Sequence, residues 1–353
     1  MNQKKNLANY FSGIRSRNDI LDEIKESAEL SHLFNGWIEE DQAAFLDLCT
    51  GMRGFKILYD AYFKEIFNPE YTPERLSNLL SVLLERKVTV KQVLPNDSTR
   101  IGDETSLIIT DIVVELEDKS LANVEVQKIG YRFSGERASC YSADLLLRQY
   151  KRLKDENKKN FSYKDIAPVY TIVFFENSPA EFKDFCDTYI HRFSEVSDSG
   201  AKLNMLQNFI FIPIDLFLNK LHNEGITNEL DAWLTFLGND EPKYIIKLID
   251  KYPYFRDLYQ DLYNMCQNVE KVVNMFSEEL QILDRNTVKY MIDEYQEQLD
   301  DTKKQLDDVK EQLDDTKEQL DDAKEQLDDA KEQLNAKDAT IAELQAKLKQ
   351  YEK

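Results

Sequence analysis

Polar side chains interrupt two strand-like stretches between Thr110 and Lys128. Asp111 precedes the apolar run IVVEL, and Glu125 and Gln127 alternate with valine in the run NVEVQ. A carboxylate within a strand core is costly unless it is paired or binds a metal. Because side chains two residues apart on a strand share a face, Glu125 and Gln127 are expected to point the same way. The spacing therefore predicts a hairpin that gathers two carboxylates and one amide at one site.

The two carboxylates suit a divalent metal ion. A turn at 118–120 brings Asp111 opposite Gln127 or nearly so, with facing Cα atoms about 5 Å apart. Asp111 and Glu125 can then bind one cation from neighbouring strands. Mg²⁺ (or Mn²⁺) fits, because Mg²⁺ binds through one or two carboxylates and keeps waters for a phosphate ligand. Such a metal activates water and neutralises charge on a phosphate. The alternative is that these polar residues only cap a half-exposed hairpin.

The hairpin lies within an alternation of helices and strands. Helices are expected in ERLSNLLSVLLER and in GERASCYSADLLLRQYKRLKDE, and strands in KVTVKQVL, SLIITDIVVEL, ANVEVQKIGY, PVYTIVFF and NFIFIPIDLFL. Pro213 ends the last of these runs or places it at a sheet edge. Two further helices are expected in NDILDEIKESAELSHLF and EEDQAAFLDLCTGMRGFKILYDAYFKEIF, and helices from Asn228 onward. The middle of the chain is therefore an αβββαβ unit of the α/β class, with a right-handed crossover.

The predicted helix after Gly135 carries a basic cluster in an acidic chain. Its members are Arg137, Arg148, Lys151 and Arg152, followed by Lys154, Lys158 and Lys159. Arg148 and Arg152 are one helical turn apart and share a face. This cluster is the best place in the chain for a phosphate backbone of DNA to bind. The alternative is a solvated helix face balanced by Asp155 and Glu156.

A seven-residue repeat of the type QLDDTKE begins near residue 298. Its leucines are Leu299, Leu306, Leu313, Leu320, Leu327 and Leu334. A small or β-branched residue follows three positions after each of the first five, which makes a heptad pattern with a weak apolar seam. The segment from Asp300 to Leu334 has 14 acids against 6 lysines, a net charge of −8. The repeat predicts a homo-oligomer formed through a coiled coil, with a lone charge-supported helix as the alternative.

Composition limits the remaining possibilities. The formal net charge of −21 argues against broad, non-specific nucleic-acid binding but not against a local basic groove. The 4 cysteines and 3 histidines are scattered, which predicts neither a disulfide framework nor a zinc site. No run of about 18 apolar residues and no signal-peptide core is present, so a cytoplasmic protein without a membrane span is expected. Four segments are predicted: 1–54 (N-terminal helices), 55–220 (central α/β domain), 221–291 (helical extension) and 292–353 (coiled coil).

Several motifs between roughly residues 55 and 291 resemble one known family. The runs LIITDI, NVEVQ and LLLRQYKR, together with ERLSNLLSVLLERKVTVKQVLPNDS and DAWLTFL, resemble the PD-(D/E)xK nuclease family transposases, also called recombination-promoting nucleases, which are abundant in bacteria. The resemblance implies a restriction-endonuclease-like fold at 55–220 and DNA phosphodiester cleavage with a divalent metal, linked to transposition or recombination of mobile elements. The family pattern places an acid on the second strand and (D/E)xK on the third, which match Asp111 and Glu125-Val126-Gln127, with glutamine in place of lysine.

The resemblance also implies a further acid from the first helix of the fold. Glu74 and Glu85 are the candidates there, and Glu104 lies in the loop before the second strand. Each is also an ordinary candidate for a solvated surface residue, and Glu74 suits a first helical turn because the helix dipole favours a carboxylate there. The choice among these three acids stays open.

Two functions from different classes fit these features. The first is a metal-dependent DNA endonuclease, which the pair of acids on one hairpin favours. The second is a catalytically weak or inactive nuclease-like protein that serves in DNA binding or assembly through its coiled coil. The missing lysine favours the second, because Gln127 can orient a water and donate a hydrogen bond but supplies no charge.

Overall fold

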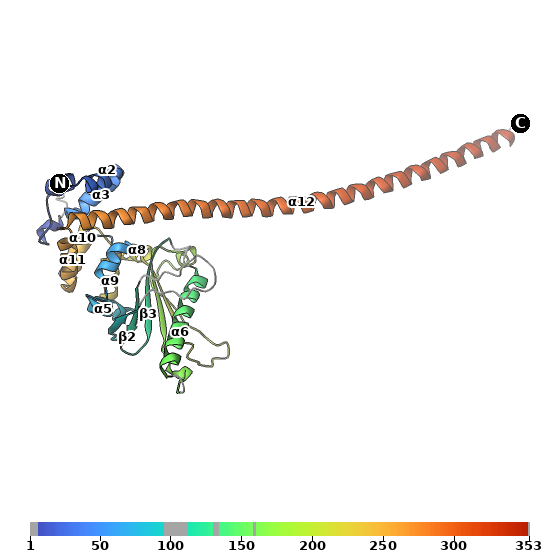
Figure 1. Ribbon diagram of the computed structural model, residues 1–353. Coiled ribbons are helices and arrows are strands. Elements are labelled where there is room, and N and C mark those ends of the chain that lie inside the picture. Colours follow the sequence, from blue (N-terminus) through green and yellow to red (C-terminus); the bar gives the residue numbers. More distant parts are fainter. Residues whose placement is uncertain (1–5, 95–111, 130–133, 158–159, 352–353) are drawn as a thin grey trace. The chain divides into compact units, whose positions relative to one another are not determined.

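The computed structural model of the chain describes residues 6–94, 112–129, 134–157 and 160–351. It contains two compact units, Met1–Leu283 and Asp284–Lys353, each considered by itself below. The first unit is a mixed α/β structure, as the sequence predicts, and the second is helical (Figure 1). Asp111 and Glu104, two of the predicted site residues, lie outside the described residues.

A mixed sheet of six strands stands at the centre of the first unit, counted over the described residues. Its order is β1-β2-β3-β4-β6-β5, with bounds β1 (Val90–Val93), β2 (Ile112–Leu116), β3 (Leu121–Ile129), β4 (Val169–Asn177), β5 (His191–Phe193) and β6 (Gln207–Pro213). β1, β2 and β3 pair antiparallel, whereas β3, β4 and β6 pair parallel. β4 is nearly continuously apolar because it is central and covered on both faces. β5 has no counterpart among the predicted strands, since three residues are too few to show a period.

The β2–β3 hairpin is present, but its turn begins one residue earlier than predicted. The N–H of Leu116 donates to the carbonyl of Ser120 over 2.9 Å, so the turn comprises 117–119 rather than 118–120. Lys119 has a φ of 69°, in the left-handed region that glycine usually supplies. A lysine gives no sequence signal for that conformation, which explains the error in the predicted turn.

The earlier turn moves the strand register by two residues. Ile112, the first described residue of β2, has Val124 as its Cα partner. The predicted pairing of Asp111 with Gln127 concerns a residue outside the described ones. That predicted pairing would also place Ile112 opposite the residue two positions beyond Val124. Ile112 pairs with Val124 itself, so the predicted register is wrong within the described part of the strand.

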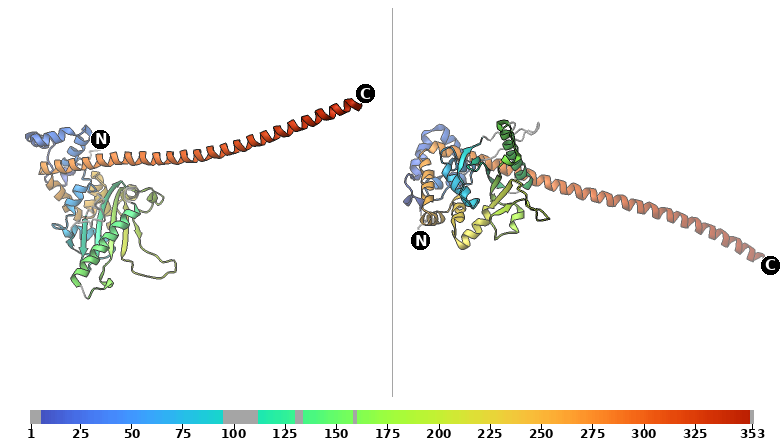
Figure 2. Two further views of the ribbon diagram at one scale, coloured as in Figure 1. Left: turned by 45° about the vertical axis from the view of Figure 1, so that its right-hand side comes forward. Right: turned by 90° about the horizontal axis from the view of Figure 1, so that it is seen from below.

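Side chains alternate between two faces along β3. Val124 belongs to the main hydrophobic core. Leu121 belongs to a separate cluster with Leu145 of α6 (Gly135–Asn157), the long helix that lies along this side of the sheet in Figures 1 and 2. Glu125 and Gln127 have the parity of Leu121, so they lie on the side that α6 covers, here called the α6 face. The opposite side is called the core face.

Helices fill the remainder of the first unit. Their bounds are α1 (Arg17–Glu26), α2 (Ala28–Gly36), α3 (Glu39–Cys49), α4 (Asp60–Ile66), α5 (Pro73–Leu83), α7 (Ala180–Lys183), α8 (Ile214–Glu224), α9 (Glu229–Gly238), α10 (Pro242–Lys251), α11 (Tyr254–Met265) and α12 (Val269–Tyr351). The two predicted N-terminal helices are each divided. Ser27 caps α2 through its hydroxyl, and Gly51, with a φ of 68°, follows α3. Apolar periodicity persists across both breaks, so it does not reveal them.

The terminal helices share one core with the sheet. Phe45 of α3 lies 5.5 Å from Phe276 near the start of α12, measured between ring centroids. Glu279 of α12 forms a buried ion pair with Lys128 at the end of β3. Parts of all three segments predicted before residue 292 thus meet in one compact unit, which ends at Leu283, eight residues before the predicted boundary at 291.

The second unit continues α12 as a helix through the repeat. Its leucines are between 52% and 60% exposed: Leu299, Leu306, Leu313, Leu320, Leu327 and Leu334. Because they recur every seventh residue, they form an apolar stripe along the helix. None of the helices in the described part of the chain combines the length and the hydropathy that a bilayer crossing requires.

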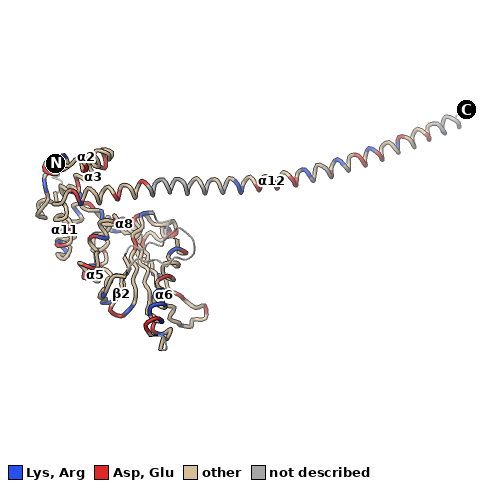
Figure 3. Tube along the Cα trace, in the orientation of Figure 1, with Lys and Arg blue, Asp and Glu red and all other residues tan. Residues whose placement is uncertain are grey.

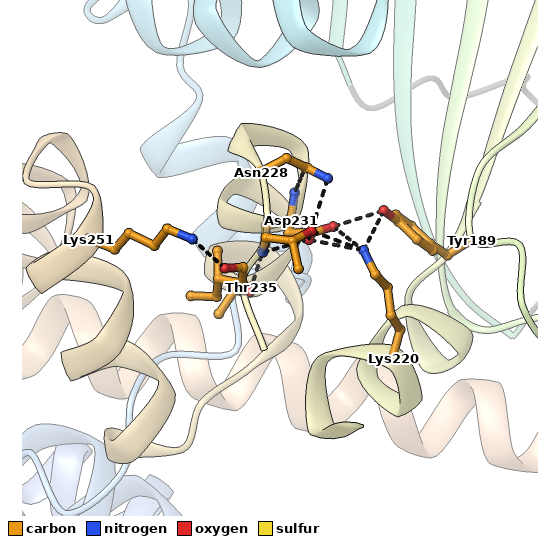
Figure 4. Close-up of polar contacts among 8 residues, drawn as sticks. Tyr189, Lys220, Asn228, Asp231, Thr235 and Lys251 are labelled. Carbon is orange, nitrogen blue, oxygen red and sulfur yellow. Dashed lines mark hydrogen bonds and ion pairs between the residues drawn. The ribbon is translucent and has the colours of Figure 1, made fainter. Parts of the chain in front are cut away.

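A buried aspartate forms hydrogen bonds with several segments that follow β4 in the chain (Figure 4). Asp231 of α9 is fully buried and accepts hydrogen bonds from Lys220 Nζ over 2.9 and 3.0 Å and from the Tyr189 hydroxyl over 2.8 Å. The N–H of Thr227 donates to it over 2.9 Å. Burial acts to raise the pKa of Asp231, but hydrogen bonds from Thr227 and Lys220 outweigh burial and lower it. The DAWLTFL run therefore has a structural role in this unit.

Asp231→Asn is expected to reduce the free energy of unfolding by about 2 kcal/mol at neutral pH, because it removes the counter-charge of Lys220. Since the folded-state pKa of Asp231 is depressed, its contribution is present above the unfolded-state pKa of about 3.9 and is lost as the pH falls through the folded-state value. Urea unfolding at neutral and acidic pH measures this. Asp250→Asn, the same change at an exposed position of α10, serves as the control. An equal loss in both variants, or one independent of pH, contradicts the assignment.

Candidate functional site

Glu125 lies on the α6 face within β3. Glu125 is 4% exposed, and its Oε1 accepts a hydrogen bond from Asn123 Nδ2 over 3.2 Å. Gln127 is half-buried two residues further along the same strand. The two residues therefore share a face, as their spacing predicts. Because Glu125 is an interior carboxylate, its surroundings must stabilise either the charge or the proton.

Polar side chains extend from Glu125 to the next strand. Asn123 is buried, and its Cα partner on β4 is Thr171, which is buried as well. Within the described ranges, Asn123 Oδ1 and Thr171 Oγ1 are buried without a hydrogen-bond partner. A buried polar atom left unpaired is costly, so their presence beside a carboxylate is typical of a site that receives a polar ligand.

A second interior carboxylate lies on the neighbouring strand. Glu115 of β2 is 3% exposed and accepts hydrogen bonds from Lys91 Nζ over 2.9 Å and Gln92 Nε2 over 3.1 Å. Arg152 Nη1 of α6 donates over 2.7 Å to Glu115 Oε2, the same oxygen that accepts from Gln92. Burial acts to raise the pKa of Glu115, but these hydrogen bonds outweigh burial and lower it. Sequence reasoning missed Glu115, although one carboxylate in the apolar run IVVEL was an available signal.

Two of the predicted phosphate-binding residues have acidic partners in the fold. Arg152 pairs with Glu115, and Arg148 Nε lies 2.7 Å from Oδ2 of the buried Asp144. The side chains of Arg148 and Arg152 are 19% and 34% exposed. Both arginines thus have charge partners inside the protein, which their sequence spacing alone did not indicate.

The other two predicted phosphate-binding residues are exposed. Arg137, in the first turns of α6, donates two hydrogen bonds to the Tyr141 hydroxyl, over 2.7 and 3.0 Å. Lys151 lies near the other end of α6, where basic and acidic segments stand together in Figure 3. Arg137 and Lys151 are therefore better placed than Arg148 and Arg152 to reach an external phosphate.

The candidate third acids on α5 are not brought to the α6 face. Glu74 is exposed in the first turn of α5, and Glu85, just after the helix, pairs with Arg192 of β5 over 2.8 Å. The leucines of α5 pack in the main core with Val124, on the core face. The helix that carries Glu74 therefore packs on the side of the sheet opposite to Glu125.

The described part of the chain holds one half of the predicted metal pair. Among residues 6–94, 112–129, 134–157 and 160–351, no three histidine, cysteine, aspartate or glutamate side chains are grouped as a metal site. The predicted pair itself includes Asp111, outside these ranges. Glu125 and Asn123 present carboxylate and amide oxygens, and these are hard donors of the kind that Mg²⁺ accepts. Their chemistry therefore fits a hard divalent cation.

Comparison with known proteins identifies a family for this chain. A family model described as PD-(D/E)XK nuclease family transposase matches residues 57–295, which is more than half of the chain. No curated protein and no solved structure matches. The matched range includes the β2–β3 hairpin, α6 and α12 as far as Tyr295, which precedes the repeat.

Arg152→Ala is expected to reduce the free energy of unfolding by about 1 kcal/mol, because it removes one of the charged donors to the interior carboxylate of Glu115. Lys151→Ala changes the neighbouring exposed cation of the same helix and should alter stability by less than about 0.5 kcal/mol. Urea unfolding of both variants at neutral pH provides the comparison. Equal effects of the two substitutions would show that the Arg152–Glu115 pair does not support the fold.

Proposed function

Because the chain belongs to the PD-(D/E)XK nuclease family transposases, we propose that it is a metal-dependent DNA endonuclease acting in transposition or recombination of bacterial mobile elements. The family assignment supports the nuclease-like, transposition-related role. The observation that carries the finer proposal is the interior carboxylate of Glu125, held by Asn123 on the α6 face. The cytoplasm, where chromosomal DNA is accessible in bacteria, is the proposed location.

The strand register supports Asp111 as the partner of Glu125. Ile112 pairs with Val124 in the described hairpin, and the residues that follow outward on the two strands are Asp111 and Glu125. The proposal requires antiparallel pairing to continue by this one residue, which puts two carboxylates opposite each other. Facing residues of an antiparallel pair lie about 4.5 to 5.5 Å apart at Cα, close enough to share one cation.

Asp111 and Glu125 are the residues proposed to hold Mg²⁺ (or Mn²⁺). When bound, the metal supplies charge neutralisation at the scissile phosphate and a more acidic water. Asn123 orients the Glu125 carboxylate through its amide, which keeps one oxygen in a fixed direction. Gln127, two residues further on the same face, is proposed to position the attacking water by hydrogen bonding. It adds no positive charge, so the proposed site is weaker than one with lysine at this position.

The DNA backbone is proposed to lie along α6. Arg137 and Lys151 supply exposed cations near opposite ends of the helix. Arg148 and Arg152 are proposed to support this surface from within, since each is paired with an interior acid. Phosphate contacts of this kind position the duplex without reading its sequence.

A second function retains the nuclease-like domain without cleavage. Glutamine at position 127 in place of the family lysine is the observation that favours it. In this alternative the protein binds DNA and assembles through its repeat. Cleavage of plasmid DNA by the purified protein with Mg²⁺ or Mn²⁺, and its loss with EDTA, separates the two functions.

Asp111→Asn tests the proposed site directly. It should abolish plasmid cleavage and the stabilisation that Mg²⁺ confers on the parent, because it removes one carboxylate of the pair. Without metal, its melting temperature should equal or exceed that of the parent, since two nearby carboxylates repel. Asp155→Asn, an exposed position on α6, should behave as the parent in both assays. Parental cleavage by Asp111→Asn would place the site elsewhere, and a lower melting temperature with unchanged activity would make Asp111 a hairpin cap.

The exposed leucine stripe of the second unit is proposed to pair with the same stripe of another copy, as a coiled coil. Truncation after Gln298 should leave the first unit folded, because that unit ends at Leu283. It should also lower the oligomeric state. Light scattering gives the masses of the full chain and the truncated chain, and circular dichroism reports their folding. An unchanged number of subunits would leave the repeat as a single solvated helix.

A further inference from the structure

A cavity of about 640 Å³ opens on the α6 face. Five aromatic side chains line it: Phe175, Phe182, Phe193, Phe209 and Phe211. They come from β4, α7, β5 and β6, and the first turns of α6 close another side. The size lies within the range of about 300 to 1,000 Å³ that is usual for pockets that bind small organic groups. This cavity is called the phenylalanine pocket.

The pocket adjoins the proposed nuclease site along the rows of the sheet. Phe175 is the Cα partner of Gln127, so these two residues are direct neighbours on β4 and β3. Val173 is the Cα partner of both Glu125 and Phe211, which therefore stand in one row, two strands apart. With strands spaced about 4.8 Å apart, the backbones of Glu125 and Phe211 are roughly 10 Å from each other. A group attached to a phosphate at Glu125 is within reach of the pocket.

Two rings at the edge of the sheet are open to solvent. Phe193 of β5 is 48% exposed, and its Cα partner on β6 is the half-buried Phe209. The ring of Phe193 also lies 5.4 Å from that of the buried Phe211, measured between centroids. Exposed aromatic rings backed by buried ones provide a rigid platform on which a planar group can stack.

The polar groups of the pocket select against a phosphate. Among the described residues, its lining includes the carboxylates of Glu136 and Glu181, the hydroxyls of Ser134 and Ser139, and no lysine or arginine. A hydrogen bond from the Ser134 hydroxyl lowers the pKa of Glu136, so this carboxylate is ionised at neutral pH. Carboxylates repel an anion but accept hydrogen bonds from the amino groups of cytosine, adenine and guanine. The lining therefore suits a neutral, planar, amino-bearing ring.

We propose that the phenylalanine pocket binds one unpaired nucleobase of the DNA strand whose phosphate lies at Glu125. This inference rests on the proposed nuclease function and extends it to the substrate class, namely DNA that is single-stranded or locally unpaired beside the cut. The phenyl rings stack on the base, and the carboxylates at the rim accept its amino group. Stacking of this kind tolerates any base sequence, so it adds affinity without base-by-base readout.

The test compares two fluorescent DNA strands of equal length and charge, one of deoxyadenosine and one of abasic sugar phosphates. Binding is followed by fluorescence anisotropy with the full chain in EDTA, so that no cleavage takes place. The parent should bind the adenosine strand about tenfold more tightly than the abasic strand. The double variant Phe193→Ala and Phe209→Ala should lose most of this preference and keep the parental affinity for the abasic strand.

Phe185→Ala is the matched control, because Phe185 is also an exposed phenylalanine of this region but does not line the pocket. It should keep the preference for the adenosine strand, and melting curves establish that all three proteins are folded. Equal binding of both strands by the parent, or an unchanged preference in the double variant, overturns the pocket assignment alone if plasmid cleavage still depends on Asp111. A parent that neither binds the strands nor cuts plasmid overturns the proposed function together with it.

Discussion

Alternation of side chains along β3 is the constraint on which the rest of the molecule depends. Val124 belongs to the main core, whereas Glu125 lies on the α6 face. A slip of one residue would exchange these two sets, placing carboxylate and amide groups in the main core. Pairing with β2 on one side and β4 on the other prevents such a slip. The position of every group in the proposed site follows from this register.

Interior carboxylates are stabilised in different ways in this protein. Glu115 and Asp231 each pair with a cation from another element, Arg152 and Lys220, and their pKa values are lowered. Both ion pairs have a structural explanation, because a buried charge destabilises the fold unless a partner of opposite charge satisfies it. Glu125 accepts a hydrogen bond from the side-chain amide of Asn123, and the oxygen of that amide is unpaired within the described ranges. An unpaired polar oxygen beside the carboxylate is therefore a feature of the surroundings of Glu125.

The acidity of the chain restricts how it can hold DNA. Of the net charge of −21, −8 belongs to the segment from Asp300 to Leu334. On α6, Arg148 and Arg152 are already committed to Asp144 and Glu115. Two of the four predicted phosphate-binding cations in the described part of α6 are thus already paired, which limits the affinity that attraction to phosphates alone gives. Stacking in the phenylalanine pocket would supply affinity that does not depend on charge, which is why the two proposals belong together.

The sequence by itself determined the features that depend on local periodicity. The alternation in NVEVQ placed Glu125 and Gln127 on one face, and the heptads predicted the long helix that follows. The αβ alternation with its family motifs led to the family that the comparison confirms. These features are readable because a strand or helix repeats its environment every two or every three to four residues.

Only the tertiary structure decided the contacts between segments distant in sequence. It paired Arg152 with Glu115 across 37 residues, placed α5 on the core face, and built the phenylalanine pocket from five elements. It also corrected the hairpin turn, since Lys119 adopts a left-handed conformation without a glycine signal. Such contacts depend on how strands are ordered and how helices pack over them, and that arrangement is set by burial of the whole core rather than by any local pattern.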